Sequence, residues 1–123
     1  MNIALWVLQV LLAVINAVHG WLFATWTPAT EKRFLERRPG TKPLQLSPGF
    51  RTFIGLAELL AAAGLILPMA TGIMPILTPL AALGFAIIMA GAVDFHLRRG
   101  ERSNAIGSAA ISAVSLFVAY MRW

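Results

Sequence analysis

The stretch Phe53-Ile-Gly-Leu-Ala-Glu-Leu-Leu-Ala-Ala-Ala-Gly-Leu-Ile-Leu67 decides how this chain folds. It is as apolar as a membrane-spanning helix, yet it carries a carboxyl group at Glu58. An ionisable side chain at membrane depth is costly and almost never faces lipid. We therefore expect Glu58 to point into a helical bundle, within hydrogen-bond reach of Asn16 or His19, directly or through one water.

The composition of the whole chain fits this interpretation. The chain has 123 residues, of which 59% are hydrophobic and only 12% are charged, whereas a soluble domain has roughly a quarter of charged residues. The apolar residues form four blocks of the length that crosses a bilayer: Ile3–Trp26, Phe50–Pro68, Ile73–Phe95 and Ala105–Tyr120. The sequence predicts an all-α, polytopic membrane protein, with residues 1–123 forming a single four-helix transmembrane domain.

The first connection is expected to contain a short helix over Pro28–Arg38. Thr27 supplies a capping hydroxyl group, and Pro28 is favoured at the first helical position. Phe34 and Leu35 give this segment an apolar side and its basic residues a polar one. Such a helix typically lies in the headgroup plane of a membrane.

Basic residues are distributed unevenly over the connections. Nine of the ten lie in the first and third, namely Lys32, Arg33, Arg37, Arg38, Lys42, Arg51, Arg98, Arg99 and Arg102. Cytoplasmic loops carry the excess of Lys and Arg. We expect a multi-pass protein of the cell membrane with loops one and three in the cytoplasm, both termini outside it, and anionic lipids as partners of the basic loops. Nucleic acid is not expected as a partner.

Three of the predicted spans have small residues along one face, the pattern through which membrane helices pack. These faces are Gly55, Glu58 and Ala62; Gly84, Ile87, Gly91 and Asp94; and Ser108, Ser112, Ser115 and Ala119. The first span has instead a polar face of Gln9, Asn16 and His19. We expect each face to meet another helix, and the same faces could support a homo-oligomer.

The polar residues of the spans gather near their cytoplasmic ends. Glu58 and His19 each lie seven residues from the end of their span, a depth of about 10 Å at 1.5 Å per residue. We predict a polar pocket with Glu58, His19 and Asp94 as acid–base residues. The residues predicted to contact a substrate are Asn16, His96 and Asn104.

Several of these residues also have plain structural interpretations. Asn16 could hold helices together, and Asp94 could simply pair with Arg98 one turn later. His96 points about 200° away from Asp94 on a helix, so only one of the two can face the pocket, and the small-residue face favours Asp94. Asn104 is expected to cap the fourth helix.

The middle of the chain resembles the DoxX-like family of small four-helix membrane proteins. The resemblance rests on Ile54-Gly-Leu-Ala-Glu-Leu-Leu60, Gly64-Leu-Ile-Leu-Pro68, Pro79-Leu-Ala-Ala-Leu-Gly84, Met89-Ala-Gly-Ala-Val93 and His96-Leu-Arg-Arg-Gly-Glu101. It implies one bundle of four transmembrane helices, with Glu58 and His96 at family-type positions, which disagrees with the preference for Asp94. Family members often carry Gly-x-x-Lys near the end of the first helix, where this chain has Asn16-Ala-Val-His-Gly-Trp21.

Three functions are compatible with these observations. The first is acid–base chemistry, such as isomerisation or epoxide opening, on a small lipophilic substrate. The second is a membrane subunit that binds quinone or docks a redox partner, since some relatives in the family are linked to thiosulfate or quinone oxidoreduction. The third is a non-catalytic lipid-binding or structural protein.

No cofactor is predicted from the sequence. The chain has no cysteine, which excludes disulfides and thiolate metal sites within it. His19, Glu58 and either Asp94 or His96 form a generic set of nitrogen and oxygen ligands. No metal site is predicted from that set, while a metal, haem or quinone stays open as an alternative.

Overall fold

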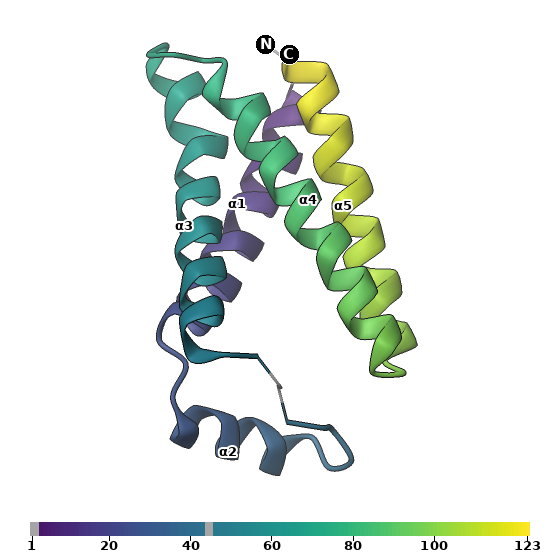
Figure 1. The fold of residues 1–123 in the computed structure, drawn as a ribbon. Helices are drawn as coiled ribbons and strands as arrows, with labels where there is room; N and C mark the ends of the chain where they lie inside the picture. Colours follow the sequence, from purple (N-terminus) through teal and green to yellow (C-terminus); the bar gives the residue numbers. More distant parts are fainter. Residues whose placement is uncertain (1–2, 44–45) are drawn as a thin grey trace.

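The computed structural model describes residues 3–43 and 46–123 (Figure 1). Its helices are α1 (Ile3–Ala24), α2 (Pro28–Arg37), α3 (Pro48–Thr71), α4 (Leu77–Arg98) and α5 (Arg102–Arg122). All except α2 are long and apolar enough to cross a membrane. The predicted all-α membrane bundle is therefore confirmed.

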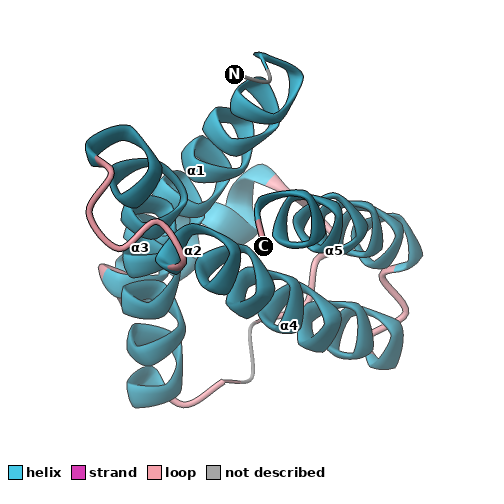
Figure 2. Ribbon diagram, turned by 90° about the horizontal axis from the view of Figure 1, so that it is seen from above, coloured by secondary structure: helices cyan, strands magenta, loops and turns pink. Residues whose placement is uncertain are grey.

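The helices form two close pairs, α1 with α3 and α4 with α5. Contacts of α3 with α4 and of α1 with α5 join the pairs. Figure 1 shows the two pairs meeting at the end that holds both termini and spreading apart toward α2. Figure 2 shows from above that α4 and α5 lie side by side, and the short turn between them makes them antiparallel. We call the end with α2 and the α4–α5 turn the basic end, and the opposite one the terminal end.

The core lies where the pairs meet. Phe85 and Leu65 are completely buried there, together with Val118. Toward the surface, large apolar side chains such as Leu60 and Ile87 are exposed, at 75% and 66%. A soluble protein rarely exposes apolar side chains on such a scale, whereas helices in a bilayer must do so because lipid is their solvent.

The ends of the spans differ from the predicted ones for identifiable reasons. Pro68 does not end α3, which continues to Thr71. A proline inside a helix removes one backbone hydrogen bond, and the carbonyl oxygen of Gly64 accepts a 2.9 Å hydrogen bond from the Thr78 hydroxyl group instead. The fourth span begins at Arg102 rather than Ala105, and Asn104 is therefore an exposed residue inside α5 and not its cap.

The short helix in the first connection is confirmed. It begins at Pro28, and the Thr27 side chain accepts a 3.2 Å hydrogen bond from the backbone N–H of Thr30. Its apolar side contacts Trp26, two residues beyond the end of α1, through Phe34, and the two ring centroids lie 5.8 Å apart. This contact fixes α2 against the membrane-spanning part of the molecule.

The small-residue rule succeeds for α5 and α3 but fails for α4. Ser108, Ser115 and Ala119 are buried, and the Ser112 hydroxyl group donates to the Ala86 carbonyl oxygen of α4 at 2.9 Å. The predicted face of α4, however, is exposed along its whole length: Gly84, Ile87, Gly91 and Asp94. Instead, α4 buries Ala82, Phe85, Ala86 and Met89, because the large side chains of Phe85 and Met89 fill the space between the two pairs.

Candidate functional site

The main polar contact inside the membrane helices joins α1 to α3. Nδ1 of His19 lies 2.6 Å from Oε2 of Glu58. The Glu58 side chain is completely buried, as expected, while the His19 side chain is 42% exposed. The two residues therefore form a short hydrogen bond, in which the carboxyl group is completely buried and the imidazole ring is open on one side.

Two glycines allow this contact. A β-carbon on Gly20 would lie 2.7 Å from the Gly55 carbonyl oxygen and 3.0 Å from the Glu58 β-carbon. Since neither Gly20 nor Gly55 has a side chain, the backbones of α1 and α3 approach closely, as small residues allow in membranes. His19 precedes Gly20 directly, and Glu58 lies one turn after Gly55, so the close approach sets their separation.

One oxygen of the Glu58 carboxyl group has no protein partner. Oε1 of Glu58 is buried and accepts no hydrogen bond, and the same holds for Oδ1 of Asn16. The Asn16 amide donates to the Leu12 carbonyl oxygen of its own helix at 3.2 Å. Asn16 is completely buried but does not bond across to another helix, so its interpretation as a polar link between helices is wrong.

The other predicted site residues do not join His19 and Glu58. Asp94 is 65% exposed and forms an ion pair with Arg98 at 3.0 Å. His96 binds Glu101 at 2.8 Å, and Asn104 is exposed. The prediction of one pocket shared by four helices, with Asp94 turned inward, is therefore wrong: α4 is rotated so that Asp94 faces outward and His96 faces the α4–α5 turn.

No group of three or more histidine, aspartate or glutamate side chains is placed to hold a metal ion in residues 3–43 and 46–123. His19 and Glu58 supply two donors, and Asp94 and His96 contact other partners. The generic ligand set considered from the sequence is thus not assembled among the described residues.

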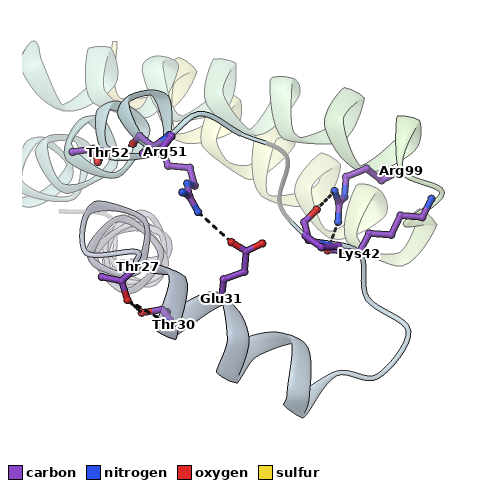
Figure 3. Close-up of polar contacts among 9 residues, drawn as sticks. Thr27, Thr30, Glu31, Lys42, Arg51, Thr52 and Arg99 are labelled. Carbon is purple, nitrogen blue, oxygen red and sulfur yellow. Dashed lines mark hydrogen bonds and ion pairs between the residues drawn. The ribbon is translucent and has the colours of Figure 1, made fainter.

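A second polar cluster occupies the α4–α5 turn. Glu101 accepts from His96 at 2.8 Å and from Nε of Arg99 at 3.1 Å. Arg99 also donates to the carbonyl oxygens of Lys42 and Pro43, at 2.6 and 2.7 Å (Figure 3). Partial burial works to raise the pKa of Glu101, but the hydrogen bonds from His96 and Arg99 and the charge of Arg99 outweigh it and lower the pKa overall. This cluster holds the basic end together.

Two arginines, Arg122 and Arg51, were not predicted as parts of any site. Arg122 donates from Nε to Oε1 of the buried Gln9 at 2.6 Å, and Gln9 donates to the Leu65 carbonyl oxygen at 2.7 Å. Arg51, treated in the sequence only as a loop charge, is buried. The series Arg51, Gly55 and Glu58, spaced by four and three residues, places Arg51 on the same face of α3 as the site and could have revealed it.

Two surface hollows on the described residues lie away from the His19–Glu58 pair. The first, of about 620 Å³, is lined by residues at the terminal end: Leu83, Leu116, Ala119, Tyr120, Met121 and Trp123. The second, of about 310 Å³, lies along the start of α1. Both are open and lined mainly by apolar residues, so they resemble lipid-facing grooves between helices more than sites for chemistry.

Comparison with known proteins agrees with the architecture. Residues 7–118 match the DoxX-like family. No curated protein and no solved structure matches the chain. With four apolar helices in one bundle and a family match over nearly its whole length, the chain is a multi-pass membrane protein that belongs to the DoxX-like family.

Proposed function

We propose that the protein performs acid–base chemistry on a small lipophilic molecule that reaches His19 from the bilayer. The observation that carries this proposal is the His19–Glu58 hydrogen bond of 2.6 Å. In this contact a completely buried carboxyl group is hydrogen-bonded to a half-exposed imidazole ring. Ionisable side chains within a membrane bundle are costly, and they therefore mark a functional site by default.

The exposures of the two residues divide the roles between them. Since Glu58 is sealed, the substrate would contact the exposed ring of His19, and Glu58 would hold the ring in place and balance its charge. Such carboxylate–imidazole pairs orient the ring and stabilise its protonated form. Glu58 is thus a positioning residue, and His19 is the group that exchanges protons with the substrate.

Isomerisation needs no further reactant. In epoxide opening, the imidazolium ring would give a proton to the epoxide oxygen as the carbon–oxygen bond breaks. The ring would then take a proton from the neighbouring carbon, leaving an unsaturated alcohol. The His19–Glu58 pair ends with the proton that it had at the start. Migration of a double bond uses the same pair, with a proton added at one carbon and removed at another.

A quinone is the second candidate ligand. The rings of His19 and Phe23 lie 4.3 Å apart, and Phe23 contacts Trp26 at 6.0 Å. A planar ring could stack on this aromatic series while a quinone oxygen accepts a hydrogen bond from His19. This alternative uses the same residues but requires no proton to be returned to carbon.

The proposal also includes an orientation, in which the basic end lies in the cytoplasm. The basic residues of the first and third connections lie at that end (Figure 1). There, Phe34 of α2 packs against Trp26. Loops one and three would then be cytoplasmic and both termini outside, which places His19 and Glu58 in the cytoplasmic half of the bilayer.

The test uses purified protein in lipid nanodiscs, incubated with a membrane lipid extract and analysed by chromatography and mass spectrometry for isomers that form. Glu58→Gln keeps the shape of the side chain but replaces its ionisable carboxyl group with a neutral amide. We expect it to reduce the rate of conversion about 10²–10⁴-fold. Asp94→Asn makes the same chemical change at an exposed position, and we expect less than about a twofold effect from it. Equal rates for wild type and Glu58→Gln, at equal thermal stability, would refute the proposal.

A further inference from the structure

Arg51 is a buried cation with two nitrogens that have no hydrogen-bond partner. It is the fourth residue of α3, and its side chain is only 10% exposed. Nε and Nη1 are buried and have no hydrogen-bond partner. The nearest carboxylate oxygen, Oε2 of Glu31, lies 3.9 Å from Nη1 (Figure 3). That distance allows charge attraction but is too long for a hydrogen bond.

A further unused donor lies beside Arg51. The indole Nε1 of Trp26 is also buried without a partner, and the guanidinium carbon of Arg51 lies 5.9 Å from the centre of the Trp26 ring. Unsatisfied N–H groups of this kind cost free energy, and charged ones cost more than neutral ones. Three such groups from two neighbouring residues indicate a ligand that accepts hydrogen bonds from all of them.

The charge of this ligand follows from the surroundings. Arg51 lies near the N-terminus of α3, where the helix dipole is positive and a cation is unfavourable. The first turn of α3 contains no acidic residue, and Glu31 offsets the charge only from 3.9 Å. An anion would relieve the repulsion and fill the three donors, and planar guanidinium groups bind phosphate oxygens especially well.

We propose that Arg51 and Trp26 form a binding site for one phosphate group, supplied by the headgroup of an anionic phospholipid. The site lies at the basic end, where Arg51 in the first turn of α3 lies near Trp26 and Glu31, and a tryptophan at this level is typical of the membrane interface. The exposed Lys32 and Arg33 of α2 attract anionic lipid in general, whereas Arg51 and Trp26 bind one headgroup. This inference does not depend on the chemistry of His19 and Glu58.

The experiment compares lipid dependence in three proteins. Wild type, Arg51→Gln and Arg33→Gln are purified in neutral detergent and titrated with phosphatidylglycerol or phosphatidylcholine, with retained lipid measured by native mass spectrometry. Arg33→Gln removes the same charge from an exposed position. We expect Arg33→Gln to bind phosphatidylglycerol as wild type does, and Arg51→Gln to bind it at least about tenfold more weakly. Equal loss in both variants, or equal binding of the two lipids by wild type, would overturn the proposal.

A second variant and a second probe complete the test. Trp26→Phe keeps the ring contacts and the Arg51 charge but removes one donor, so a severalfold weaker binding of phosphatidylglycerol supports the site, and unchanged binding contradicts it even if Arg51→Gln fails to fold. Inorganic phosphate distinguishes the source of the anion. If it raises the melting temperature of wild type but not of Trp26→Phe, the phosphate site stands but its ligand is soluble; if only the lipid acts, the ligand is the headgroup.

Discussion

Gly20 and Gly55 lie so close together that a β-carbon on Gly55 would come within 2.7 Å of the Gly20 carbonyl oxygen. It would also collide with the backbone of Ala24. The backbones of α1 and α3 cannot give way without separating. Because His19 and Glu58 lie on either side of this contact, the two glycines determine whether the hydrogen bond between them can form.

Gly55→Ala should therefore destabilise the bundle and weaken the site. We expect a loss of about 1–3 kcal/mol in the free energy of unfolding, as for other overpacked positions, measured by thermal or chemical unfolding in detergent. Gly84→Ala is the matched control, because a β-carbon there meets no atom within 4 Å and alanine favours the helix. If both variants unfold alike, the close approach of α1 and α3 is not needed.

A substitution of Asn16 can show whether this residue binds a substrate or supports the fold. Its Oδ1 is buried without a partner, and its side-chain amide donates to the Leu12 carbonyl oxygen of its own helix. Asn16→Leu should thus leave stability unchanged or raise it by up to about 1 kcal/mol, since an unsatisfied buried group is removed. If Asn16 contacts the substrate, the same variant should convert it more slowly. A loss of stability of 2 kcal/mol or more would show that Asn16 supports the fold.

Glu101 should make the basic end sensitive to acid. Its pKa in the folded protein is lowered, with burial opposing and the contacts of His96 and Arg99 prevailing. The carboxylate thus contributes stability that is fully present above its unfolded pKa, near the ordinary value of 4.5, and is lost as the pH falls through the lower folded pKa. Melting temperatures from pH 7 to pH 3 should fall more for wild type than for Glu101→Gln. The exposed Glu36→Gln should follow wild type, and parallel curves for all three would contradict the assignment.

Much of the fold could be predicted from the sequence because lipid imposes a simple rule on long helices. The four spans, the α2 helix and the inward position of Glu58 follow from hydropathy, capping residues and the cost of a buried carboxyl group. His19 was identified as a partner for the same reason. Each of these predictions depends on the sequence of a single helix or on one pair of polar groups, and not on how the helices pack.

The remaining parts depend on how helices are rotated, which local patterns do not determine. Small residues on α4 indicated that Asp94 faces inward, but Phe85 and Met89 fill the space between the pairs better, and Asp94 is satisfied by Arg98. The same rotation brings His96 to Glu101. Likewise, Arg51 lies beside Trp26 and Glu31 of the first connection, and a count of loop charges cannot show this.

The orientation in the membrane can be measured with reporter fusions. We expect a fusion after Trp123 to be active only with a reporter that works outside the cytoplasm, and a fusion within the first connection, after Gly40, to show the opposite. The uneven basic charge gives the direction, and four spans put both termini on one side (Figure 1). Activity of a cytoplasmic reporter after Trp123 would invert the protein and place His19 and Glu58 in the outer half of the bilayer.

The last prediction concerns the proline inside α3. Pro68 leaves the Gly64 carbonyl oxygen without its helical partner, and Thr78 of α4 supplies the missing hydrogen bond at 2.9 Å. Thr78→Val should cost about 1 kcal/mol of stability, because Thr78 is completely buried and its hydrogen bond to the Gly64 carbonyl oxygen is lost. In a Pro68→Ala background the new backbone N–H can bond to Gly64, so Thr78→Val should then cost clearly less. Unfolding of the four proteins of this double-mutant cycle measures the coupling. Equal costs in both backgrounds would show that Thr78 acts independently of Pro68, and that α3 tolerates its proline for another reason.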